Sequence, residues 1–247
     1  QSPWDRMTLI FKILDQMFSQ KLELWQAMNR FTEDRYPQRA LELAEQHSTE
    51  ADWENANYWY ALGRAQFIMS KEDLAERSLL QCLEIEPSHK RGRIVYGDLL
   101  HETNRGQKAH EIYTEIIQES GIQGDGETPQ RISMAELLGF KGIIHSPIYA
   151  IAILSGHEDT SEETWERASA AFYYSPHFRT RHAYHMIQQQ QNAQALAKLY
   201  ALSREMPWFK DAVINAYSII EQLGLKDRMA EQRTWLKSIM DQNEWKI

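Results

Sequence analysis

The chain has 247 residues, of which 43% are hydrophobic and 25% charged, and its net charge is −8. This composition is typical of a folded protein and excludes collagen-like and low-complexity chains. The acidic balance predicts no nucleic-acid partner, because phosphate contacts require concentrated positive charge. A single cysteine, Cys82, excludes an internal disulfide and a multi-cysteine zinc site. No apolar run approaches the roughly 20 residues that a membrane-spanning helix needs.

The first 21 residues begin an apolar stripe at helical spacing. Tryptophan or phenylalanine recurs every seven residues, with methionine or leucine between: Trp4, Met7, Phe11, Leu14, Phe18, Leu22, Trp25 and Met28. A helix over residues 1–21 would bring these side chains to one face, and we expect it to cap a helical array. A homodimer interface and a membrane-surface contact are the alternatives. Asp5, Lys12 and Asp15 form no basic face, which disfavours the membrane.

A period of 34 residues follows this segment. The unit that starts at Ala56 combines the spacings Trp-x2-Leu-Gly and Ala-x3-Leu-x2-Cys-x4-Pro, carried by Trp59, Leu62, Gly63, Ala75, Leu79, Cys82 and Pro87. A second unit starts at Lys90, with Gly97 and Ala109 in the equivalent small-residue positions. A third starts at Pro176, with Ala183 and Ala195 there. Three matches in register indicate a repeat protein.

These spacings resemble those of the tetratricopeptide repeat family. The resemblance covers residues 56–123 and 176–209 well, and residues 22–55, 142–175 and 210–243 more weakly. It implies an all-α, right-handed α-α superhelix of about six helix-turn-helix units. Gly63 and Gly97 are expected to be small because the two helices of a unit cross closely there, opposite Ala75 and Ala109.

The repeat frames form two blocks. Starts at residues 22, 56 and 90 give a first block of three units over 22–123, and starts at 142, 176 and 210 give a second block over 142–247 that ends in a C-terminal helix. Residues 124–141 interrupt the phase. Gly124 and Gly126 predict a loop there, and Thr128 followed by Pro129 predicts the start of an extra helix. A tolerated insertion and a hinge or partner contact are both open.

The resemblance also implies a binding groove. In tetratricopeptide arrays, positions 2, 5, 9 and 12 of the first helix of each unit line a concave surface. The matching positions here are Asn57, Tyr60, Arg64, Phe67, Arg91, Ile94, Asp98, His101, Thr180 and Tyr184. Aromatic side chains beside arginines suit an extended or helical peptide with an acidic residue, since arginine can hold a carboxylate through two parallel hydrogen bonds. Residues that are merely solvated are the alternative. The lysine–asparagine clamp of chaperone-binding members of the family is absent.

The sequence offers no catalytic motif. It contains no P-loop, no Gly-x-Ser-x-Gly and no His-Glu-x-x-His pattern, so we expect neither an enzyme nor a cofactor. Cys82 is expected to be a packed thiol. His182 and His185 are three residues apart and could face one metal ion, but no third ligand lies at helical spacing on the same face, and Arg179 and Arg181 are cations. The sequence therefore predicts no metal site.

Together these patterns predict a non-enzymatic scaffold or adaptor that holds a segment of another protein in its groove. Two alternatives stay open: a self-associating structural component of an envelope or secretion assembly, and the recruiting domain of a larger enzyme. The chain begins with Gln1 instead of methionine, which indicates N-terminal processing or an excised segment. The compartment is left open between the cytoplasm and the periplasm or secreted side.

Overall fold

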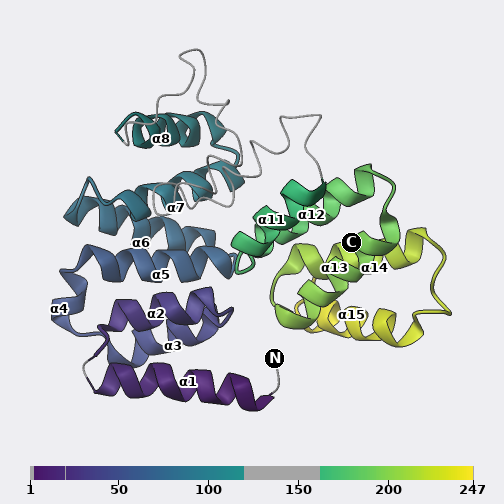
Figure 1. Ribbon diagram of the computed structural model, residues 1–247, viewed down its shortest axis with the longest axis horizontal. Helices are drawn as coiled ribbons and strands as arrows, with labels where there is room; N and C mark the ends of the chain where they lie inside the picture. Colours follow the sequence, from purple (N-terminus) through teal and green to yellow (C-terminus); the bar gives the residue numbers. More distant parts are fainter. Residues whose placement is uncertain (1–2, 20, 120–161, 247) are drawn as a thin grey trace. The chain divides into compact units, whose positions relative to one another are not determined.

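A computed structural model describes residues 3–19, 21–119 and 162–246. These residues form thirteen helices and no strand, which confirms the prediction of an all-α chain (Figure 1). The chain divides into two compact units, residues 1–149 and 150–247. The predicted insertion at 124–141 and the first helix expected after residue 142 lie outside the described residues. None of the described helices is long and apolar enough to cross a membrane.

The described helices of unit 1 follow one another in a single stack, with the first helix at one end (Figure 1). They are α1 (Pro3–Phe18), α2 (Leu24–Glu33), α3 (Pro37–His47), α4 (Glu50–Trp53), α5 (Ala56–Ile68), α6 (Glu72–Ile85), α7 (Lys90–Glu102) and α8 (Gly106–Glu119). The single turn α4 was not expected from the repeat pattern. It starts after Thr49, whose side chain and that of Asp52 form a reciprocal capping box.

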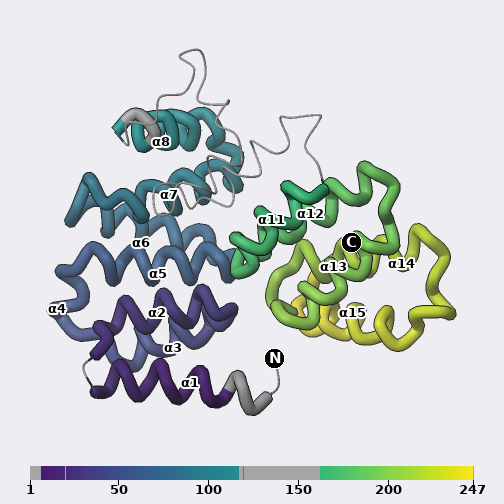
Figure 2. The backbone as a smooth tube through the Cα atoms, viewed as in Figure 1, coloured from purple at the N-terminus to yellow at the C-terminus, as the bar shows by residue number. Residues whose placement is uncertain are grey.

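Unit 2 contains five described helices, and its trace again doubles back at each short turn (Figure 2). They are α11 (Glu162–Ala171), α12 (Pro176–Gln188), α13 (Asn192–Glu205), α14 (Lys210–Gln222) and α15 (Ala230–Gln242). The helix pairs α5/α6, α7/α8 and α12/α13 have three-residue turns, whereas residues 223–229 separate α14 from α15. The last pair therefore departs from the spacing of the others.

Helices pack against their neighbours in sequence and also against the next pair. In unit 1 the first helices of successive pairs touch, α2 with α5 and α5 with α7, while α6 packs on α7. In unit 2, α12 contacts both α13 and α14, and α14 contacts α15. The core is therefore continuous along each stack, as expected where every pair buries its apolar face on the next one.

Two glycines permit the closest helix crossings. A Cβ atom added at Gly63 would lie 2.7 Å from Cγ of Leu79, and one added at Gly97 would lie 2.8 Å from Cε1 of Tyr113. Ala75, opposite the first crossing, is completely buried. The prediction that these positions must be small is confirmed, because any larger side chain would overlap the second helix of its pair.

The turn inside each helix pair has one recurring conformation. Each contains one residue of positive φ, at Arg35 (71°), Ser70 (55°), Asn104 (61°), Gln190 (62°) and Gly224 (65°). The next amide donates a hydrogen bond to the carbonyl five residues earlier, as in Lys71 to Gln66 at 2.9 Å. This bond closes a Schellman ending of the first helix. The sequence repeat is therefore accompanied by a recurring backbone conformation in the turns.

Candidate functional site

The predicted groove positions on α5 contribute mainly to the packing of unit 1. Tyr60, Arg64 and Phe67 are buried, and Asn57 is half-buried. The Arg64 guanidinium donates to Asn29 Oδ1 at 3.3 Å and to Glu33 Oε1 at 3.1 Å. Both acceptors belong to α2, so this arginine joins the first helices of two successive pairs.

Tyr60 and Asn57 belong to a network around His89. The Gly92 amide donates to His89 Nδ1 at 2.9 Å, so Nδ1 is an acceptor and Nε2 carries the proton. Nε2 then donates to Asn57 Oδ1 over 3.1 Å, and the His89 ring packs on Tyr60 with centroids 5.3 Å apart. Burial lowers the pKa of His89, which keeps the imidazole neutral in this network. His89 thereby caps α7 and ties it to α5.

The predicted positions on α7 are divided between interior and surface. Ile94 and Asp98 are buried, and Asp98 accepts a short hydrogen bond from the hydroxyl of Tyr113 on α8. Arg91 is exposed and His101 is half-exposed. Because α5 packs against α7, the accessible part of the predicted groove in unit 1 consists of Asn57, Arg91 and His101.

The two predicted positions on α12 belong to unit 2. Thr180 is buried, and Tyr184 is half-buried with its hydroxyl hydrogen-bonded to the amide nitrogen of Asn215 on α14. Arg181 lies over the Tyr184 ring, 5.9 Å from its centroid. Of the ten predicted positions, six are thus interior: Tyr60, Arg64, Phe67, Ile94, Asp98 and Thr180. The repeat spacing alone could not reveal this burial, because it does not show how deeply neighbouring helices cover each position.

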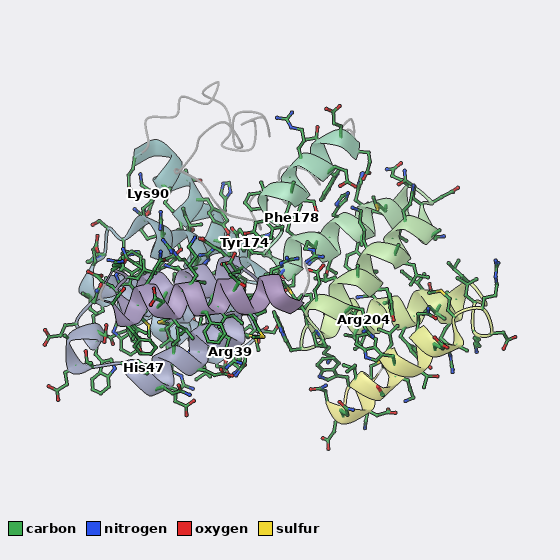
Figure 3. All side chains as sticks on the ribbon, turned by 60° about the horizontal axis from the view of Figure 1, so that its bottom comes forward. Arg39, His47, Lys90, Tyr174, Phe178 and Arg204 are labelled. Atoms are coloured by element: carbon green, nitrogen blue, oxygen red, sulfur yellow. The ribbon has the colours of Figure 1, made fainter. Side chains whose placement is uncertain are left out.

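Helix α1 is apolar on two opposite sides. Ile13 is 2% exposed and packs inward. About 120–160° around the helix from Ile13, Met7, Phe11 and Phe18 are 47%, 64% and 64% exposed, and Leu14 lies beside them. α1 is the foremost helix of unit 1 in Figure 3. Among the aromatic contacts of the described residues, the Phe18 ring makes only an edge contact with the His47 ring, with centroids 5.5 Å apart. The outward stripe is an exposed apolar surface of the kind that marks an interaction site.

A second cluster of polar side chains joins α11 and α12. His182, which is fully buried, makes a 2.8 Å contact through Nε2 with Glu162 Oε1. The other oxygen of Glu162 lies 3.8 Å from His185 Nε2. Glu166, one turn further along α11, offers an oxygen within 4.8 Å of the His182 and Glu162 ligand atoms. We call these four side chains the His–Glu cluster.

The surroundings of the His–Glu cluster hold it in place. The Trp165 indole stacks on both imidazoles, 5.5 Å from His182 and 4.8 Å from His185, nearly parallel to each. Lys198 of α13 forms a 2.8 Å ion pair with one oxygen of Glu166, and this hydrogen bond lowers the pKa of that carboxyl. Burial lowers the pKa of His182, so its ring is neutral near pH 7.

Sequence reasoning missed the acidic half of this cluster. It sought a third ligand beside His182 and His185 on their own helix, where none is found. Glu162 and Glu166 are four residues apart on α11, so they share a face, and that face packs on α12. A search for Glu-x3-Glu on a helix next to His-x2-His would have found the pair.

Cys82 is fully buried, and burial raises the pKa of its thiol to about 12, so it is a packed side chain and not a nucleophile.

No protein-family model matches the chain, and no curated protein matches its sequence.

Proposed function

We propose that the protein is a non-enzymatic interaction scaffold, a tetratricopeptide-like superhelix that pairs with a second copy of itself through the outward face of α1. The observation that carries the proposal is the double-sided apolar character of this helix. A helix that only capped the stack would bury one side and present polar residues on the other. Here Phe11 and Phe18 are each 64% exposed on the side opposite Ile13.

The face is self-complementary in an antiparallel arrangement. Pairing Met7 with Phe18 of the second copy brings Phe11 opposite Leu14 of that copy, so that a large side chain meets a smaller one in each layer. The same register brings Lys12 within two residues of the position opposite Asp15 of the second copy, on the exposed border of the stripe. A two-fold axis repeats each of these contacts, as a closed dimer requires.

Sedimentation equilibrium tests the pairing directly. The wild-type protein is expected to dimerise in the micromolar range, and Phe11→Glu to be monomeric with unchanged helical circular dichroism. Leu80→Glu is the matched control, because Leu80 is also an exposed apolar residue, 46% accessible, but lies on α6. A wild-type protein that stays monomeric at 100 times that concentration, or a Phe11→Glu dimer as tight as wild type, would refute the proposal.

A second candidate function is peptide binding in the groove of unit 1. It is favoured by the exposed Arg91 near the start of α7, whose guanidinium suits an acidic segment. Replacing Tyr60 or Arg64 would disturb the interior, so Arg91→Glu is the cleaner test. We expect this variant to lose any acidic peptide that wild type binds in a peptide-array screen. Equal binding by both would remove the groove from consideration.

A further inference from the structure

Two buried polar atoms of the His–Glu cluster have no hydrogen-bond partner among the described residues: Oε2 of Glu162 and Nδ1 of His182. Oε2 of Glu162 faces His185 Nε2 across 3.8 Å, too far for a hydrogen bond. A buried carboxylate oxygen without a donor is costly, and a cation or a proton is what normally satisfies it.

The geometry points to a zinc site formed by His182, His185, Glu162 and Glu166. In a tetrahedral Zn²⁺ site with bonds of about 2.0–2.1 Å, neighbouring ligand atoms lie about 3.3 Å apart. The ligand atoms of His182, Glu162 and Glu166 lie within 4.8 Å of one another, and His182 Nε2 is 2.8 Å from Glu162 Oε1. His185 Nε2 lies 3.8 Å from Oε2, the other oxygen of Glu162. Rotation of the partly exposed Glu162 and Glu166 carboxylates would bring one oxygen of each to that spacing from the imidazole nitrogens.

The donor set selects this class of metal. Two imidazole nitrogens favour Zn²⁺ and its first-row neighbours over Mg²⁺ and Ca²⁺, which prefer oxygen ligands alone. A metal-bound imidazole must be deprotonated at its ligating nitrogen, so the ion would displace the Nε2 proton that His182 donates to Glu162. Four protein ligands leave no coordination position open for a substrate, so the zinc would be structural and would lock α11 to α12.

The His–Glu cluster is also open to solvent on one side and held by a neighbouring side chain on the other. The histidine side is closed by the stacked Trp165, which fixes both ring planes, whereas the Glu162 and Glu166 side chains are 37% and 51% exposed and give the ion a route from solvent. The ammonium of Lys198 lies 2.8 Å from one oxygen of Glu166. The other oxygen is left to bind metal, and Lys198 competes with the ion electrostatically.

Cobalt substitution tests the site. The full chain, purified without a histidine tag, is titrated with Co²⁺ and followed by visible absorption, and Zn²⁺ is then added. We expect one Co²⁺ per chain with the intense bands of tetrahedral coordination, displaced by one equivalent of Zn²⁺. His185→Ala and Glu162→Gln, both at partly exposed positions, should each weaken Co²⁺ binding at least about tenfold. His110→Ala, an exposed histidine on α8, should bind as wild type does.

A fourth variant addresses the alternative of a closed ion-pair network. Lys198→Met removes the competing cation and should tighten Co²⁺ binding. Co²⁺ affinity equal to or below that of wild type in this variant would contradict Glu166 as a ligand. Absence of a saturable Co²⁺ spectrum in wild type, or a spectrum unchanged in His185→Ala and Glu162→Gln, would overturn the site altogether. Circular dichroism of each variant shows whether it is folded.

Discussion

Replacing Gly63 by alanine is the sharpest test of the close helix crossing in unit 1. The added Cβ would lie 2.7 Å from Cγ and 3.0 Å from Cδ2 of Leu79, and 3.3 Å from the Ala75 carbonyl oxygen. Overpacking of this kind costs about 1–3 kcal/mol. Alanine regains up to about 1 kcal/mol over glycine in a helix. When this gain is subtracted, we expect the free energy of unfolding to fall by up to about 2 kcal/mol.

The matched control is Gly106→Ala at the start of α8. An added Cβ there would meet no atom within 4 Å, so the propensity gain is not opposed and the variant should be as stable as wild type or up to about 1 kcal/mol more stable. Urea unfolding followed by circular dichroism at 222 nm compares the two variants. If Gly63→Ala is stabilised as much as Gly106→Ala, the crossing is looser than the structure has it and the packing argument fails.

Two further predictions concern the turns and the histidine network. Gln190→Gly should raise the thermal midpoint and Gly224→Ala should lower it, because both residues have φ above 60°, a conformation that favours glycine. Each change should alter the free energy of unfolding by about 1 kcal/mol. Opposite or absent shifts in calorimetry would count against the shared turn conformation. The pKa of His89 is lowered in the folded state, so the unfolded chain binds more protons, and the stability from this group is lost as the pH falls below about 6.5. His89→Asn keeps an N-cap acceptor and should flatten the decline in urea midpoint between pH 7 and 5; an unchanged slope would contradict the buried neutral imidazole.

The repeat pattern predicted much of the local structure, because small residues that recur at one spacing indicate positions where two helices cross closely. Four helices begin at the first residue of a predicted repeat frame: α5 at Ala56, α7 at Lys90, α12 at Pro176 and α14 at Lys210. Gly63 and Gly97 lie at the crossings for which they were singled out. Hydrophobic period and turn residues are local properties, and they determine where helices begin and how a pair closes.

Properties that depend on neighbouring helices were less accessible. Arg64 was expected to face a peptide, yet it is buried against Asn29 and Glu33, because the preceding pair supplies acceptors 35 and 31 residues away. Likewise, Glu162 reaches His182 from a separate helix. The start of α15 at Ala230 depends on the longer turn after Gly224, which a fixed 34-residue frame does not anticipate.

Site-specific cross-linking tests the antiparallel pairing of α1 most directly. Cys82 is buried, with a thiol pKa of about 12, so a cysteine introduced on α1 is the reactive one. In the proposed register, Leu14 lies about 4.5 Å along the helix axis from Leu14 of the second copy, whereas the two Met7 positions are about 16 Å apart. A short bis-maleimide should therefore cross-link Leu14→Cys efficiently and Met7→Cys poorly. Equal cross-linking of both variants, or none in either, would contradict the account.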